Sequence, residues 1–165
     1  MATHKKTEKR RSEIVEAAVS HLVAYGFQQS GLRAIAKSVG ISDRMIMYYF
    51  ETKEDLISAA LELIGESLAN GMDAAVPQDN MTAGQLLHAL SKALQTEEVR
   101  SIMQLWFEII GLAMRGEEPY RQTAALLLSR SEEQIRTKLR SNQKHKAREV
   151  LAALEGGVMI ELLLD

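Results

Sequence analysis

The sequence has no cysteine among its 165 residues, only two prolines, and an aromatic content of 5%. Without cysteine, disulfide frameworks and thiolate metal sites are excluded. No stretch approaches the ~18 consecutive apolar residues of a membrane span, and no apolar segment of the signal-peptide type follows the basic N-terminus. These absences lead us to expect a cytoplasmic protein without a membrane partner.

The residue types that carry catalysis are present but are not grouped. The four histidines are scattered and show no metal-ligand spacing. The sequence contains no glycine-rich phosphate loop and no nucleophile elbow. Paired glutamates at 97–98, 117–118 and 132–133 fall at expected helix starts or on polar faces, where they suit the helix dipole or solvation. We therefore predict that the protein is not an enzyme and uses neither a metal nor a cofactor.

The net charge of −2 is distributed unevenly along the chain. Residues 1–56 hold nine Lys/Arg against seven Asp/Glu, whereas residues 57–165 hold eleven against fifteen. Among the first eleven residues, one glutamate opposes a group of basic residues: Lys5, Lys6, Lys9, Arg10 and Arg11. A basic arm on an acidic body is typical of a protein that contacts an anionic polymer at one end. The alternative is a solvated, frayed terminus.

Apolar residues recur at helical spacing along the chain, and β-branched alternation is nearly absent. The expected helices cover residues 7–27, 31–39, 43–49, 53–75, 83–95, 97–115, 119–140 and 144–164. Capping signals precede four of them: Ser30, Ser42, Thr52 and Thr82. The sequence therefore predicts an all-α fold.

The segment "SVGISDRMIMYYF" holds more large apolar residues than its short third helix can bury. Ile46 and Phe50, four residues apart, can face inward, which leaves Met45, Met47 and Tyr48 on outer faces. The tight turn "VGIS" joins this helix to the one before it, as in a helix-turn-helix. In that motif the second helix enters the major groove of DNA. We therefore expect DNA to cover the outward side chains.

The candidate DNA contacts have distinct chemical roles. Arg44 can donate to guanine O6 and N7, and the thioethers of Met45 and Met47 can touch a thymine methyl group. The hydroxyls of Tyr48 and Tyr49 can hydrogen-bond to phosphates.

Four further candidates flank this helix. Arg33 can reach a phosphate or a base edge, and Lys53, at the start of the fourth helix, can bind a phosphate. Asp43 either caps its own helix or accepts a hydrogen bond from a cytosine amine. Ser42, the expected cap of the third helix, completes the candidate set.

Residues 14–56 closely resemble the DNA-binding domain of the TetR family of bacterial transcriptional regulators. The resemblance rests on "AAVSHLVAYGF", "SGLRAIAKSVGIS" and "MIMYYFETKEDLI". The family often has Thr at the position of Met45 and Tyr at that of Met47, where it makes phosphate contacts, and Met cannot donate a hydrogen bond to a phosphate. Arg44 replaces a small residue, often Gly, which suggests a base contact particular to this chain.

The resemblance implies a division of labour within the chain. Residues 1–52 would form the helix-turn-helix domain, and residues 53–165 a helical bundle for ligand binding and dimerisation. Family members form homodimers through their last two helices, and a twofold dimer reads a palindromic operator with half-sites about 34–36 Å apart. The expected interface residues are Leu127, Val150, Leu154, Gly156, Gly157 and Val158. Gly156 and Gly157 indicate close packing against another backbone, a kink, or the end of the helix with a loose tail behind it.

The helix expected at 97–115 is apolar nearly all round, which predicts a buried position. Family members enclose a small-molecule pocket there. The candidate lining residues are Met72, Met103, Trp106, Phe107, Ile110 and Met114. The alternative is that these side chains are ordinary core. Glu108 would either meet a cationic or hydroxylated ligand or face solvent.

The sequence and the resemblance together predict a DNA-binding transcriptional regulator, most simply a repressor released by a small molecule. The partners would be double-stranded DNA, a second copy of the chain and an effector of unknown identity. The alternative is a dimeric helical interaction protein of the same fold that does not bind DNA.

Overall fold

The computed structural model describes the backbone of residues 2–76 and 79–164, with side chains from residue 6 onward within those ranges. Its helices are α1 (Ala2–Tyr25), α2 (Leu32–Val39), α3 (Asp43–Tyr49), α4 (Lys53–Ala75), α5 (Ala83–Ala93), α6 (Glu97–Met114), α7 (Tyr120–Lys138) and α8 (Ala147–Leu164), with a 3-10 helix, η1 (Ser141–Lys146), before α8. The described residues contain no β-strand, and the predicted all-α fold is confirmed.

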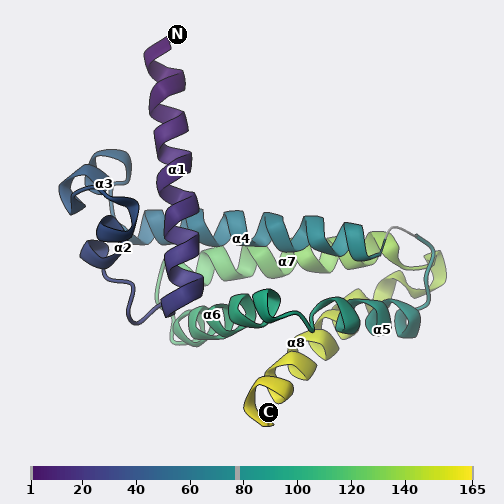
Figure 1. Ribbon diagram of the computed structural model, residues 1–165. Helices are drawn as coiled ribbons and strands as arrows, with labels where there is room; N and C mark the ends of the chain where they lie inside the picture. The colour runs from purple at the N-terminus through teal and green to yellow at the C-terminus, as the bar shows by residue number, and fades with distance from the viewer. Residues whose placement is uncertain (1, 77–78, 165) are drawn as a thin grey trace.

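The helices form an elongated body with a smaller group at one end. Helices α4 and α7 lie side by side along the body, and α1 crosses α4 steeply (Figure 1). At one end of α4, helix α2 packs on α1 and α3 packs on α2, while α5 and α8 pack together at the other end. Helix α4 therefore runs from the helix-turn-helix into the body. Among the described residues, no helix has the length and hydropathy needed to cross a membrane.

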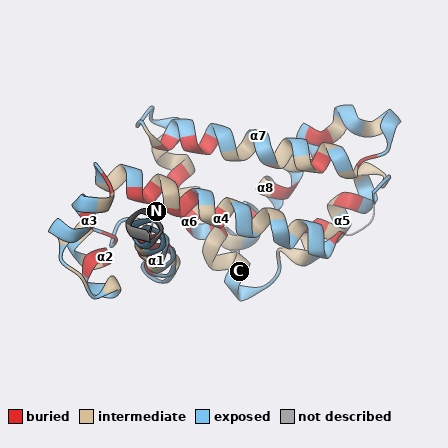
Figure 2. Cartoon of the chain, turned by 90° about the horizontal axis from the view of Figure 1, so that it is seen from above, coloured by how far each residue is buried: buried red, intermediate tan, exposed pale blue. Residues whose placement is uncertain are grey.

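Two clusters of buried apolar side chains hold this arrangement together, and in Figure 2 the buried residues lie on the helix faces that meet one another. The first cluster joins α1–α4 to α6 and to the start of α7. The second joins α5 and α8 to the end of α7. His21, which its place in the first apolar stripe assigns to the core, is buried, and its ring centroid lies 4.7 Å from that of Tyr25.

Three of the four predicted N-caps are confirmed. The Ser42 side chain accepts a hydrogen bond from the Met45 N–H. Thr52 and Thr82 each form a capping box, with Asp55 and Gln85 respectively. Such caps satisfy backbone N–H groups that have no partner within the helix, so short sequence signals suffice to place them.

Three predicted helix boundaries were wrong. Helix α1 begins at Ala2, and α8 begins at Ala147 after the 3-10 turn. Ser30 does not cap α2, because Gly31 takes the N-cap position and the Ser30 hydroxyl donates instead to the Gly26 carbonyl at 2.6 Å. Ser30 thereby ties the loop back to the end of α1.

Candidate nucleic-acid interface and ligand pocket

Helix α3 is fixed by two buried side chains on its inner face. Ile46 is 0% exposed and Phe50 is 3% exposed, as their spacing predicted. Gly40, with φ of 73°, ends α2 in the left-handed region, where a residue with a Cβ would be strained. The helix-turn-helix is therefore anchored from both ends of the turn.

The outer face of α3 carries large side chains in solvent. Met45 is 46% exposed, Met47 42% and Tyr48 74%. Arg44 is also exposed, whereas Tyr49 packs partly against the first core cluster. The rings of Tyr48 and Tyr49 meet edge to face, with centroids 5.1 Å apart. The chain thus displays a basic, apolar and aromatic surface on a rigidly held helix.

Asp43 has two partners within the helix-turn-helix. One carboxylate oxygen accepts a hydrogen bond from the Arg44 N–H at 2.9 Å, at the start of α3. The other lies 3.6 Å from the guanidinium of Arg33, whose side chain is 94% exposed. Asp43 therefore neutralises part of the positive charge that Arg33 presents.

The other basic candidates lie against aromatic rings. The Lys53 ammonium is 4.9 Å from the Phe27 ring centroid, and the Arg11 guanidinium is 4.6 Å from that of Phe50. The basic arm continues α1, and its N-terminal end stands clear of the body (Figure 1). Lys5 lies outside the residues whose side chains are described.

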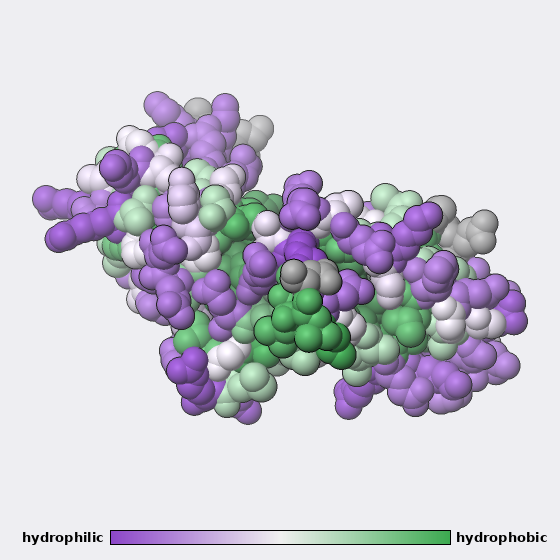
Figure 3. Space-filling model, turned by 60° about the horizontal axis from the view of Figure 1, so that its bottom comes forward, coloured by the Kyte–Doolittle hydropathy of each residue, from purple (hydrophilic) through white to green (hydrophobic). Residues whose placement is uncertain are grey.

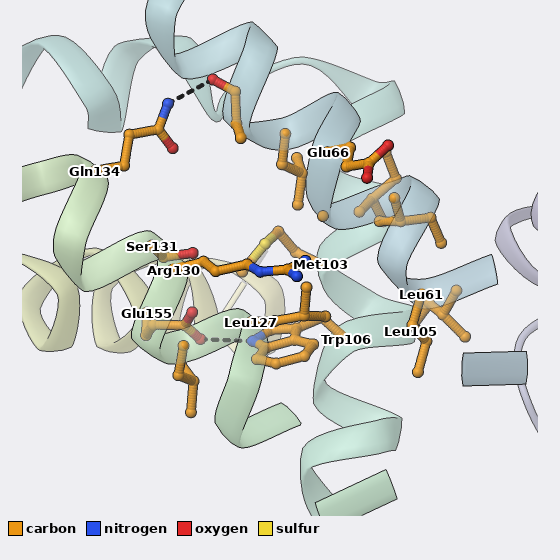
Figure 4. Close-up of a pocket in the computed structure, with 16 residues that line it drawn as sticks. Leu61, Glu66, Met103, Leu105, Trp106, Leu127, Arg130, Ser131, Gln134 and Glu155 are labelled. Atoms are coloured by element: carbon orange, nitrogen blue, oxygen red, sulfur yellow. Dashed lines mark hydrogen bonds between the residues drawn. The ribbon is translucent and has the colours of Figure 1, made fainter. Parts of the chain in front are cut away.

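A cavity of ≈ 140 Å³ lies between α4, α6, α7 and α8. Figure 4 shows side chains from these helices converging on it. Its walls are mainly apolar, and its polar side chains are Glu66, Trp106, Arg130, Ser131, Gln134 and Glu155. Within the described ranges, no three His, Asp or Glu side chains come together as a metal site.

One polar pair joins two walls of this cavity. The Trp106 indole N–H of α6 donates to a carboxylate oxygen of Glu155 of α8 at 2.9 Å (Figure 4). Burial raises the pKa of Glu155 above its usual value, although the indole N–H acts in the opposite direction. On the opposite wall, the Gln134 amide donates to the Ala69 carbonyl at 2.8 Å.

Only two of the six predicted pocket residues line this cavity, Met103 and Trp106. Phe107, Ile110 and Met114 are not among the lining residues, and Met114 is 79% exposed. Helical spacing puts Ile110 and Met114 on the same face of α6 as Met103, but they lie about two and three turns further along the helix, beyond the lining residues 102–106. The sixth, Met72, packs against the second core cluster.

The predicted interface residues of α8 mostly serve the subunit's own core. Val150, Leu154 and Val158 are buried within the single chain. Leu127 lines the cavity and packs against α4. These four side chains therefore do not form a free face. Gly156 and Gly157 have no atom within 4 Å of the place that a Cβ would occupy, and α8 continues through both.

A different set of apolar side chains lies free at the end of α8. Figure 3 shows hydrophobic residues gathered in the middle of one face of the molecule. We call this set the α8 patch: Met159, Ile160, Leu163 and Leu164, which are 45%, 53%, 76% and 81% exposed. Exposure on this scale at neighbouring positions often marks an interaction surface.

Known proteins are similar to this chain in sequence. A family model described as "Bacterial regulatory proteins, tetR family" matches residues 14–60. The HTH-type transcriptional regulator PksA of Bacillus subtilis (strain 168) is 27% identical over 114 residues. That alignment covers 68% of this chain and 56% of PksA, so the chain spans little more than half of that relative's length.

Solved structures match nearly the whole chain. A TetR transcription regulator from Haloarcula marismortui has a TM-score of 0.75 at 18% identity, covering 96% of this chain and 88% of that one. The multidrug binding protein EbrR, in complex with proflavin, has a TM-score of 0.70 at 24% identity, covering 94% of this chain and 89% of that one. At these identities the likeness establishes the fold.

Residues 14–60 thus form a domain of the TetR family type. The sequence resemblance over residues 14–56 is therefore confirmed, and the family match runs on into α4. TetR-family proteins are transcription regulators. The matched segment contains α2, the turn and α3, which carry most of the candidate DNA contacts. Those individual contacts stay predictions.

Sequence reasoning placed Glu108 differently from its position in this TetR-family fold. Its carboxylate neither lines the cavity nor faces solvent freely, because one oxygen accepts the Phe27 N–H at 3.0 Å. The other oxygen lies 2.7 Å from the place that a Cβ at Gly26 would occupy. Gly26 also has φ of 74°, so no other residue fits easily. Glu108 thus connects α6 to the end of α1.

The predicted pocket set omits most of the lining residues, among them Glu155 and Gly65. Glu155 follows Leu151 by four residues and precedes Val158 by three, so a carboxylate interrupting an apolar stripe was the available signal. Gly65 brings α4 close to α7, because a Cβ there would lie 2.5 Å from Leu127 Cδ2. Nothing in the sequence pairs these two positions.

Proposed function

We propose that this chain is a dimeric TetR-family repressor whose α3 helices read a near-palindromic operator. The observation that carries the proposal is the outer face of α3, where Arg44, Met45 and Tyr48 are exposed on a helix anchored by Ile46. Large apolar side chains in water are unfavourable, whereas a major groove offers thymine methyl groups and base edges to them.

Two copies are proposed because a seven-residue helix reads few base pairs. The α8 patch supplies an apolar surface on which a second copy could dock, together with the open Gly156 and Gly157 positions. In this proposal the interface uses the patch rather than the buried α8 residues.

The cavity between α4, α6, α7 and α8 is proposed as the effector site. EbrR, of the same fold, was solved in complex with proflavin, which supports a small-molecule effector for this chain. The proposed division of the chain follows: residues 1–52 for DNA, and residues 53–165 for effector and dimer.

The proposed coupling runs through two helices. Helix α4 carries cavity residues and begins directly after the helix-turn-helix, and α6 carries Trp106 and the Glu108 contact to Phe27. A ligand that favours one position of these helices changes the separation of the two α3 helices. A ~100-fold preference for one state shifts the equilibrium by about 2.7 kcal/mol. Glu108→Ala should therefore weaken the effect of the ligand on DNA binding while leaving ligand affinity unchanged.

Selection from a random DNA pool at about 0.15 M salt tests the function, because non-specific binding is weak there. An enriched near-palindrome is the expected result. If no sequence is enriched even after denaturation and refolding to remove any bound ligand, the proposal fails.

One observation favours a second candidate, an interaction protein that does not bind DNA. Met45 and Met47 cannot donate to phosphate, and Asp43 neutralises part of the charge of Arg33. In that case the exposed face of α3 would bind protein, and the DNA selection would return no motif.

A further inference from the structure

Glu155 is the polar group of the cavity whose capacity for hydrogen bonds is least used. A carboxylate can accept about four hydrogen bonds. Among the residues that the structure describes, Glu155 accepts one, from the Trp106 indole at 2.9 Å. The side chain is partly buried, and burial of a carboxylate without a cationic partner is unfavourable. The raised pKa of Glu155 reflects the same cost.

The other charged groups around the cavity lie in solvent. Glu66 on α4 and Arg130 on α7 are both exposed, and the α6 wall contributes no charged residue. Solvent screens the exposed charges more than it screens the partly buried carboxylate. Figure 4 shows the exposed Arg130 side chain extended across the cavity toward Met103, whereas the partly buried charge in the cavity wall is the negative one of Glu155.

The remaining surface suits a flat apolar body. Leu61, Ile64, Leu105 and Leu127 form apolar walls, and the Trp106 indole lies beside the carboxylate (Figure 4). The volume of ≈ 140 Å³ is close to that of an apolar cavity of about 150 Å³ that holds benzene. An indole face also attracts cations.

We propose that the effector is a hydrophobic cation with at least one aromatic ring, its charged nitrogen paired with Glu155 and its ring among the apolar walls. This inference rests on the proposed function, in which this cavity is the effector site. An anionic ligand would meet the Glu155 carboxylate, and its only cationic partner among the lining residues would be the solvent-exposed Arg130.

The test uses three probes of similar shape and different charge: phenyltrimethylammonium, tert-butylbenzene and benzenesulfonate. Trp106 is the only tryptophan in the chain, so its fluorescence reports the cavity directly. Calorimetry gives an independent dissociation constant. We expect the cation to bind about tenfold or more tightly than the anion, equivalent to about 1.4 kcal/mol.

Variants test whether the preference for the cation comes from the carboxylate of Glu155. Glu155→Gln keeps an oxygen that can accept the indole N–H, so the fold should be retained while the charge is lost. It should weaken cation binding about tenfold and leave tert-butylbenzene within about twofold of the original protein. Glu66→Gln, at the exposed rim, is the matched control and should change cation binding less than about twofold.

Several results would overturn the inference. They are equal or tighter binding of benzenesulfonate, loss of that binding in Arg130→Gln, an unchanged cation affinity in Glu155→Gln, or no detectable binding of the cation. None of these measurements needs DNA. A protein that selects an operator but fails here keeps its proposed function and loses only the assigned ligand class.

Discussion

Helix α3 and the cavity between α4 and α8 depart from ordinary folding patterns in opposite directions. Helix α3 places Met45, Met47 and Tyr48 in water, whereas the cavity places the carboxylate of Glu155 among apolar side chains. Each arrangement lowers the stability of the isolated chain and provides a surface that a partner can cover. Departures of this kind are expected at functional sites, since the rest of the fold supplies the stability.

The inner and outer faces of α3 should separate stability from DNA binding. Ile46→Ala removes a side chain that is 0% exposed, and should lower the free energy of unfolding by about 2–4 kcal/mol. Met47→Ala, one residue away, should change it by less than about 0.5 kcal/mol but weaken DNA binding. Urea unfolding monitored by circular dichroism measures the first effect. A large loss of stability in Met47→Ala would show that the outer face is structural.

Two glycines of α4 give a matched pair for the cavity. Gly65→Ala places a Cβ 2.5 Å from Leu127 Cδ2, which must move, whereas Gly71 has nothing within 4 Å. Gly71→Ala should therefore stabilise the protein by up to about 1 kcal/mol through helix propensity. Gly65→Ala should stabilise the protein less than Gly71→Ala does, and it should bind phenyltrimethylammonium several-fold more weakly. Equal ligand affinities in the two variants would contradict the packing described for α4 and α7.

The pH dependence of stability should reveal the cost of the buried carboxylate. The pKa of Glu155 is raised above its ordinary value of 4.5, so the folded chain holds this proton more tightly than the unfolded chain. The stabilising contribution of this proton is complete below the ordinary pKa. It is lost as the pH rises through the pKa of Glu155 in the folded chain. The stability of the original protein relative to Glu155→Gln should therefore fall from pH 4 to pH 7.

Unfolding by urea at several pH values measures this difference. Glu66 and Arg130 are present in both proteins, so their titration cancels to first order. Cation affinity should rise over the same pH interval, because phenyltrimethylammonium has a fixed charge. A difference that is constant with pH would mean that Glu155 is solvated like a surface residue.

Asp43 offers the smallest and most specific change at α3. Asp43→Asn releases Arg33 from an exposed ion pair of 3.6 Å and removes a negative charge near the proposed DNA. Exposed pairs contribute roughly 0.2–1 kcal/mol, so folding stability should change little. DNA affinity should rise a few-fold at low salt, and the gain should shrink as salt increases. A loss of affinity would instead indicate that Asp43 contacts a base.

The two regions also differ in how far sequence alone predicted them. At α3 the controlling interactions are local, such as the Ser42 cap and the four-residue spacing of Ile46 and Phe50, so pattern and capping rules sufficed. Ser30 shows the limit of such rules, since the extended Gly31 displaced it from the cap.

At the cavity the controlling contacts join distant segments. Trp106 and Glu155 are 49 residues apart, and Phe27 and Glu108 are 81 apart. Helical spacing shows that a residue faces inward, but it does not show which helix lies opposite. For this reason helical spacing pointed to Met103 and Trp106, which line the cavity, but not to the charged residues opposite them.

Parallel selections with the original protein and Arg44→Ala test most directly whether α3 reads DNA. Lys92→Ala, at an exposed position of α5, controls for the loss of a positive charge. We predict one near-palindrome for the original protein and for the control. Arg44→Ala should return the same motif with base preference lost at one symmetric pair of positions. Discrimination between bases there should fall by about 1–3 kcal/mol. The same sharp motif from all three proteins, or none from the original, would contradict the account.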